Sequence, residues 1–172
     1  MLAKVRSLPV TRLLGGSAVI AASLVPTAAV ADNTKAPLQF FSGKTEMTST
    51  VKVIMKKPFK SRAVGLGHIL GDGSLALAQQ VFDDGEAAKL RNWKIRQVAP
   101  GHYSGSMTEA VGPVVVDEID GRYRFKFRMK GNLAIEQWLT PQPGGASARS
   151  TMTVRKFGMK VASSVGVIRK LA

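Results

Sequence analysis

The sequence predicts an all-β protein in which about eight to ten antiparallel strands close into an up-and-down barrel. Apolar and polar residues alternate with a period of two along most of the chain, which is typical of strands with one buried face. Turn-forming pairs such as Asp72-Gly73, Pro100-Gly101 and Asp120-Gly121 recur between the alternating segments. No segment shows a convincing period of 3.6 residues. Short hairpins place neighbouring strands side by side, and closure removes the free edges of the sheet.

Each segment with the strand pattern is bounded by turn residues or by proline. A polar lead-in at 32–37 precedes the first of them. Lys57-Pro58 separates the first two, because proline has no N–H group to donate to a ladder. Gly65 and Gly67 weaken one face of the second segment or let something approach closely. The expected strands are residues 47–55, 64–70, 75–82, 89–98, 103–111, 113–119, 122–130, 132–139, 150–154 and 161–171.

The clearest hairpin joins residues 113–119 to residues 122–130 through Asp120-Gly121, since Asp-Gly tolerates the positive φ angles of a two-residue turn. In its second strand, large apolar residues alternate with basic ones. Each large buried side chain stabilises such a strand by roughly 1.5–3 kcal/mol, and a slip of one residue would turn it inside out. We expect an inner row of Tyr123, Phe125, Phe127 and Met129 and an outer, membrane-facing row of Arg122, Arg124, Lys126, Arg128 and Lys130.

The outer basic row has two interpretations. Near an anionic membrane, each basic residue adds roughly 1 kcal/mol of attraction. Alternatively, the row is a solvated strand face whose charges are met by acidic residues of the hairpin partner, namely Asp117, Glu118 and Asp120.

The first 31 residues have the pattern of a signal peptide. Lys4, Arg6 and Arg12 precede an uncharged apolar run at 13–25, and Ala29-Val30-Ala31 fits a signal-peptidase site. The run is shorter than the about 20 residues of a membrane span. An uncleaved membrane anchor is the alternative. We expect a periplasmic protein with one barrel domain at 32–172.

The composition excludes some kinds of chemistry and favours anionic partners. The chain has no cysteine, so disulfides, thiolate metal sites and amino-terminal lipidation of a cysteine are excluded. Without the three basic residues of the leader, the 25 Lys and Arg become 22 against 11 acids, a formal charge of +11. The expected partners are an anionic membrane surface and a lipid or fatty-acyl ligand rather than nucleic acid, for which no motif is visible. A basic surface kept for solubility is the alternative.

Four stretches of the chain resemble a bacterial family of exported proteins, many of them lipoproteins, catalogued as domain of unknown function 3833. The resemblance covers roughly residues 38–171, and its most specific parts are Arg91-x-Trp93, Tyr103-x-Gly105 and Lys156-Phe157-Gly158. The four stretches are FFSGKTEMTS, FDDGEAAKLRNWKI, GHYSGSMTEAVG and MTVRKFGMKVASSVGVI.

The resemblance implies a lipocalin-like barrel, and genes of the family often lie near those of fatty-acid-modifying enzymes. It implies no catalytic residues. Many relatives carry a lipid-attachment cysteine where Ala31-Asp32 stands here, which implies a soluble periplasmic form. Relatives also tend to have an acidic and aromatic segment before the last strands, where this chain has TPQPGGASARST.

The residue pattern predicts a ligand-binding barrel interior, and no metal or other cofactor is expected. The two histidines, His68 and His102, lack the spacing of a metal site. Arg91 is expected to stack on Trp93 and close one barrel end or, alternatively, to pair with a buried Glu109. The expected ligand-binding residues are Val64, Leu66, His68, Arg91, Trp93, Met107, Glu109, Tyr123, Phe125, Phe127 and Met129.

Three functions are compatible with this pattern. The first is a barrel that holds an acyl chain or other apolar ligand, with Arg91 or His68 at its polar end. The second is a lipid-modifying enzyme or its accessory subunit, in which His68 and Glu109 act as acid and base and must lie within hydrogen-bonding reach. The third is a filled structural barrel that acts through protein contacts and has no pocket. The oligomeric state is not predicted.

Overall fold

The structure is a computed structural model that describes residues 37–172. The predicted signal peptide at 1–31 and the first residues of the predicted domain at 32–172 lie outside the described residues, so both boundaries stay predictions. Within 37–172 no helix is long and apolar enough to cross a membrane. The elements are α1 (Pro37–Phe40), β1 (Gly43–Val53), β2 (Phe59–Ile69), β3 (Leu75–Asp83), β4 (Lys89–Ala99), β5 (His102–Met107), β6 (Val114–Ile119), β7 (Arg122–Met129), β8 (Leu133–Pro141), β9 (Ser147–Lys156) and β10 (Met159–Lys170).

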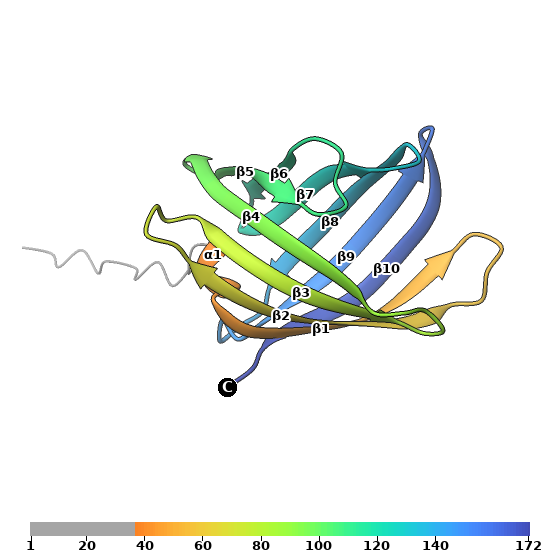
Figure 1. The fold of residues 1–172 in the computed structure, drawn as a ribbon, viewed down its shortest axis with the longest axis horizontal. Helices are drawn as coiled ribbons and strands as arrows, with labels where there is room; N and C mark the ends of the chain where they lie inside the picture. The colour runs from red at the N-terminus through yellow and green to blue at the C-terminus, as the bar shows by residue number, and fades with distance from the viewer. Residues whose placement is uncertain (1–36) are drawn as a thin grey trace, which may run out of the picture. The chain divides into compact units, whose positions relative to one another are not determined.

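The ten strands form one closed antiparallel barrel (Figure 1). Each strand pairs with its neighbour in the sequence, and β10 returns to pair with β1, where Met47 lies opposite Ile168. The predicted all-β, up-and-down barrel is confirmed. Helix α1 was not predicted, because its four residues are too few to show a helical period.

The hairpin of β6 and β7 has the predicted geometry. Asp120 and Gly121 have φ angles of 51° and 69° and join Ile119 directly to Arg122. The inner row of β7 points into the barrel, and Tyr123, Phe125 and Phe127 are buried, with Met129 partly buried. The predicted orientation of this strand is confirmed.

Helix α1 and the residues after it close one end of the barrel. Leu38 and Phe41 are buried, and the ring of Phe41 meets the ring of Phe125 edge-on with centroids 6.5 Å apart. Phe41 fits because Gly67 of β2 has no side chain: a Cβ atom at Gly67 would lie 2.0 Å from the Phe41 carbonyl oxygen. Lys170 of β10 holds the same segment by donating to the Ser42 carbonyl at 2.9 Å. The α1 end is therefore plugged by apolar side chains.

The opposite end of the barrel, which we call the mouth, carries five strand connections. They are the segments 54–58, 84–88, 108–113, 130–132 and 157–158. In Figure 1 the mouth lies to the right and α1 to the left. Access to the barrel interior is therefore expected from the mouth.

Candidate functional site

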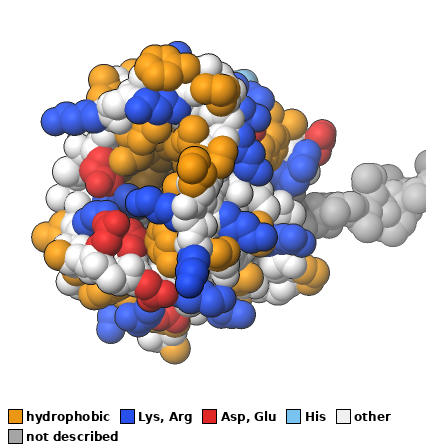
Figure 2. Space-filling model, turned by 90° about the vertical axis from the view of Figure 1, so that its right-hand side faces the viewer, with side chains coloured by type: hydrophobic (Ala, Val, Ile, Leu, Met, Phe, Trp, Pro, Cys, Tyr) orange, Lys and Arg blue, Asp and Glu red, His pale blue; other side chains and the backbone are white. Residues whose placement is uncertain are grey.

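A cavity of about 540 Å³ occupies the barrel interior on the mouth side of Phe41. Figure 2 looks onto the mouth and shows a hollow with hydrophobic walls and charged side chains beside it. Residues at the mouth, including Val53, Ile54 and Phe59, belong to its lining together with residues deep in the barrel. The apolar wall includes Met47, Leu77, Val81, Ile95, Ile135 and Met152. The interior is therefore a mostly apolar chamber that is closed at the α1 end.

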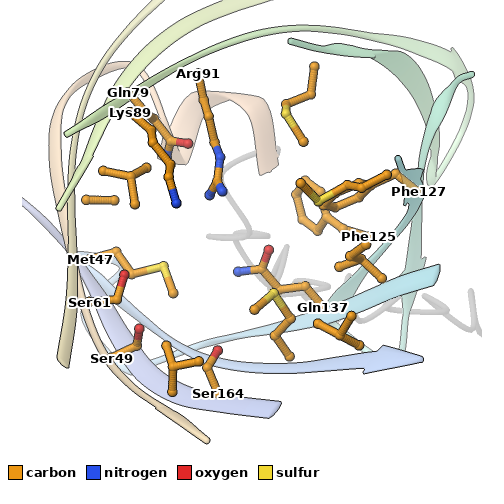
Figure 3. A pocket seen from close by; sticks show the side chains of 18 of the residues that line it. Met47, Ser49, Ser61, Gln79, Lys89, Arg91, Phe125, Phe127, Gln137 and Ser164 are labelled. Atoms are coloured by element: carbon orange, nitrogen blue, oxygen red, sulfur yellow. The ribbon is translucent and has the colours of Figure 1, made fainter. Parts of the chain in front are cut away.

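Two basic side chains of β4 point into this chamber near the mouth (Figure 3). Arg91 donates from Nε to the Glu109 carboxylate, and the side chains of both residues are about two-thirds buried, with 28% and 31% exposed. Lys89 pairs with Glu86 and lies 3.7 Å from Asp83. The hydrogen bond to Glu86 raises the pKa of Lys89, so this amine stays charged. The wall near the mouth thus carries two cations, each paired with carboxylates, beside an apolar space.

Further along β4 from the mouth, Trp93 is held in the chamber wall by two contacts. Its indole Nε1 donates to Gln79 Oε1 at 2.7 Å, and its ring meets Phe127 edge-on with centroids 5.7 Å apart. The predicted stacking of Arg91 on Trp93 is therefore wrong, and the alternative, an ion pair between Arg91 and Glu109, is what forms. The ion pair forms because the Glu109 carboxylate is a charged hydrogen-bond acceptor within reach of the guanidinium.

A polar patch lies in the wall formed by β1, β2 and β10, where Ser49, Ser61 and Ser164 line the chamber (Figure 3). Ser164 is 3% exposed, and its hydroxyl has no hydrogen-bond partner among residues 37–172. By contrast, Ser150 outside the cavity lining accepts a bond of 2.9 Å from Gln137. A buried hydroxyl without a partner costs free energy, so Ser164 offers a bond to whatever fills the chamber.

Six of the predicted ligand-binding residues are brought together in the cavity wall: Arg91, Trp93, Met107, Phe125, Phe127 and Met129. Tyr123 and Glu109 lie outside the lining. Tyr123 is buried in the core towards the α1 end, and Glu109 follows β5 and holds Arg91. Their roles in binding stay predictions.

The predicted inward face of β2 is wrong. Leu66 is 45% exposed, His68 is exposed and Val64 shares their outer face, whereas Ser61 and Ala63 line the cavity. The inner positions further along are Gly65 and Gly67. A Cβ atom at Gly65 would lie 2.9 Å from Thr45 Oγ1, and one at Gly67 would meet Phe41. Only glycine fits there, so the larger side chains are left on the outside.

The predicted acid–base pair of His68 and Glu109 does not form. His68 projects from the outer face of β2, and strands β3 and β4 separate it from the segment after β5 that carries Glu109. Glu109 is engaged by Arg91 instead. The two side chains are thus not within hydrogen-bonding reach, which the enzymatic hypothesis requires.

The outer basic row of β7 is partly neutralised. Arg124 donates to Asp117 at 2.8 Å, and this bond lowers the pKa of Asp117 despite partial burial. The guanidinium groups of Arg122 and Arg124 lie 4.7 and 5.7 Å from the centre of the Trp138 ring. Asp117 therefore supplies part of the opposite charge that the solvated-face interpretation requires. The membrane-facing role of the row stays a prediction.

The sequence alone missed several residues of the site, namely Lys89, Gln79, Ser49, Ser61 and Ser164. Two of them carried a signal. Ser49 interrupts the apolar row of Met47, Val51 and Val53, and Lys89 lies two residues before Arg91 on the same strand face.

Solved structures of other proteins share this architecture. The S-type phycobiliprotein lyase CPES from Guillardia theta matches with a TM-score of 0.63 at 7% identity, over 78% of this chain and 90% of that chain. The protein Rv2717c from M. tuberculosis matches with a TM-score of 0.59 at 12% identity, over 78% and 95%.

A third match is a protein of unknown function from the DUF3598 family of Nostoc punctiforme, with a TM-score of 0.56 at 9% identity. The match covers 78% of this chain and about half, 49%, of that chain. These proteins are lipocalin-like barrels. This chain has the fold of a lipocalin-like barrel.

No family model and no curated protein matches the sequence of this chain. Its expected membership of the family of domain of unknown function 3833 therefore stays a prediction. At these identities the solved structures show the fold alone.

Proposed function

We propose that this lipocalin-like barrel is an exported binding protein for one lipid or other apolar ligand, which it holds at or near an anionic membrane surface. It would support fatty-acid or envelope lipid metabolism. The observation that carries the proposal is the chamber of about 540 Å³, which is lined mainly by apolar side chains and has Lys89 and Arg91 in its wall near the mouth. Its volume lies within the about 300–1,000 Å³ that is typical of small-molecule pockets.

The wall favours a long apolar group. Burial of one methylene contributes about 0.8 kcal/mol, so an acyl chain that fills the chamber gains stability with each added carbon. The flexible side chains of Met47, Met107, Met129 and Met152 adapt the wall to different chain shapes. A family of chain lengths rather than one rigid molecule is therefore the expected ligand class.

The basic side chains near the mouth keep further N–H donors for an anionic head group beside the carboxylates that pair with them. Nε of Arg91 is used by Glu109, and the terminal amino groups bring further N–H donors on a planar fork that suits a carboxylate or phosphate. These groups extend into the chamber in Figure 3. The head would lie beside Arg91 and Lys89, with the chain directed towards Phe41.

The two alternatives find less support. The filled barrel requires an interior without a pocket, whereas the chamber here is open enough for a ligand. The enzymatic hypothesis rested on His68 and Glu109, but His68 is exposed on the outside of β2, whereas Glu109 lies in the connection after β5 and pairs with Arg91. We therefore propose binding without assigning a reaction.

A fluorescent fatty-acid titration in solution tests the proposal. The wild-type protein should show saturable binding of one ligand. Arg91→Gln should weaken binding of the acid by about tenfold, since a charge-assisted hydrogen bond is lost. The same variant should change the affinity for the matching fatty alcohol much less.

Arg96→Gln is the matched control, because Arg96 lies on the same strand but is exposed on the outer face. It should leave both affinities unchanged. Absence of saturable binding in the wild type would overturn the proposal, and an equal loss in the two arginine variants would remove Arg91 from it. Mass spectrometry of lipids that co-purify with the protein would identify the natural ligand.

A further inference from the structure

We propose that the mouth docks on an anionic lipid bilayer through two neighbouring hairpin tips, and that the ligand passes between bilayer and chamber at this contact. The tips are residues 54–58, between β1 and β2, and residues 155–160, around the β9–β10 turn; we call them the docking hairpins. The inference rests on the proposed function and assigns the membrane contact to the mouth rather than to the outer face of β7.

The docking hairpins expose large apolar side chains that no packing explains. Met55 is 99% exposed, Phe157 72%, Met159 68% and Ile54 64%. The two tips lie next to each other on the ring, because β1 pairs with β10 and the Ile54 amide donates to the Val161 carbonyl at 2.9 Å. A cluster of this kind at one end of a barrel is typical of a binding surface, unlike single exposed apolar residues.

The backbone of the tips makes these residues more unusual. Met55 has a φ of 60° and Phe157 a φ of 50°, a conformation in which glycine, asparagine and aspartate are the favoured residues. Turns with such angles normally carry polar side chains. Here apolar side chains occupy strained positions and are exposed to solvent, which points to a contact outside the barrel.

Basic residues surround the apolar tips. Lys56 and Lys57 follow Met55, while Arg155, Lys156 and Lys160 flank Phe157, and the docking hairpins contain no acidic residue. The ammonium group of Lys156 lies 5.8 Å from the centre of the Phe157 ring. Apolar side chains among cations are the composition that enters the interface of an anionic bilayer. Figure 2 shows hydrophobic and basic side chains together around the hollow.

The acidic residues at the mouth do not cancel these cations. Asp83 and Glu86 pair with Lys89, and Glu109 pairs with Arg91. Asp84, which accepts the backbone N–H of Lys60 at 3.0 Å, keeps its charge but lies in the β3–β4 connection, outside the docking hairpins. Within residues 37–172, no salt bridge engages the five basic residues of the docking hairpins. Their charge is therefore available to an anionic surface.

The same arrangement connects docking to the chamber. Ile54 belongs both to the exposed tip and to the cavity lining, next to Val53 and Val161. A bilayer held at the docking hairpins would lie over the opening. An acyl chain could then slide between the lipid and the barrel without crossing water.

Vesicle flotation tests the proposal with the full mature chain. The protein should bind vesicles of phosphatidylglycerol and phosphatidylcholine but not vesicles of phosphatidylcholine alone, and added salt should weaken binding. Met55→Asn with Phe157→Asn removes the two most exposed apolar side chains of the docking hairpins, and asparagine tolerates the backbone angles. Lys56→Gln with Lys57→Gln removes two charges. Each double variant should weaken binding at least about tenfold.

Matched controls change the same kinds of residue elsewhere. Val98→Asn alters a side chain that is 54% exposed at the α1 end of the barrel, and Lys94→Gln with Arg96→Gln removes two exposed charges from the outer face of β4. Both should bind vesicles like the wild type. The tryptophan of Phe157→Trp should be quenched by brominated lipid, whereas that of Val98→Trp should not.

The outcomes separate this inference from the proposed function. Fatty-acid binding in solution without vesicle binding would overturn the docking surface and leave the binding function standing. Loss of vesicle binding in Arg122→Gln with Arg128→Gln, but not in the variants of the docking hairpins, would place the contact on β7. Binding of the wild type to uncharged vesicles with equal strength would overturn the anionic bilayer as the partner.

Discussion

Trp93 and Gln79 are locked together on the inner wall of the barrel by a hydrogen bond of 2.7 Å from the indole Nε1 to the amide oxygen. The bond joins the paired, neighbouring strands β3 and β4. It satisfies the polar atom of the indole, so that the ring can present its apolar surface to Phe127 and the chamber. The wall of the candidate site is thereby shaped before any ligand arrives.

Filling the chamber should abolish binding without unfolding the barrel. Ala63 lines the cavity on β2, and Ala63→Phe would place a ring in the space that a chain occupies. Ala78→Phe is the matched control, because Ala78 is exposed on the outer face of β3. Fatty-acid titration should show a loss of at least about tenfold for Ala63→Phe alone. Equal affinities of the two variants would place the ligand outside the chamber.

The buried hydroxyl of Ser164 should destabilise the ligand-free protein. Ser164→Ala removes a buried group without a partner and should raise the free energy of unfolding by about 1 kcal/mol. Ser150→Ala removes an equally buried hydroxyl that accepts a bond from Gln137 and should lower it by about 1 kcal/mol. Urea unfolding measures both values. A destabilised Ser164→Ala would show that the hydroxyl is already satisfied in the free protein.

Gly67 should be intolerant of any side chain. A Cβ atom at this position would lie 2.0 Å from the Phe41 carbonyl oxygen, so Gly67→Ala must displace the plug at the α1 end. We expect a loss of roughly 1–3 kcal/mol in the free energy of unfolding. Gly71→Ala is the control, since nothing lies within 4 Å of its added carbon. Thermal unfolding that is the same for both variants would contradict the tight contact.

The ion pair of Asp117 and Arg124 should make stability depend on pH in the acid range. The hydrogen bond from Arg124 lowers the pKa of Asp117 below 3.8, so the stabilisation is complete above the unfolded value and is lost as the pH falls through the lower folded value. Asp117→Asn should therefore be less stable than the wild type near neutral pH, and the difference should shrink below about pH 4.

Urea unfolding from about pH 6 to about pH 2.5 measures this difference. Asp120→Asn serves as the control, because Asp120 is exposed in the turn and asparagine tolerates its φ of 51°. A constant difference between the wild type and Asp117→Asn across the range would refute the ion pair as its source.

The sequence predicted the barrel because the physics of a strand is local. In β7, four large apolar residues at every second position leave one possible orientation, and Asp120-Gly121 specifies the turn before it. The face of β2 could not be predicted in the same way. Its apolar residues Leu66 and Val64 lie outside because Phe41 and Thr45, distant in sequence, fill the space within.

In the candidate site, too, residues that follow from local alternation were predicted, and residues that depend on distant parts of the chain were not. Phe125, Phe127 and Met107 were predicted from alternation, since an inner face needs only a count of residues. The pairing of Arg91 with Glu109 was one of two open alternatives, because it depends on how the segment after β5 folds over β4. Ser164 was missed altogether, as a serine on a strand does not reveal whether its hydroxyl will find a partner.

Pairing of β1 with β10 joins the two ends of the described chain in one ladder. During synthesis the second edge of β1 therefore stays uncovered until β10 has been made. A nascent or truncated chain without β10 would present the bare edges of β1 and β9, which invite association with other chains. Deletion of β10 is thus expected to lower the solubility of the newly synthesised polypeptide.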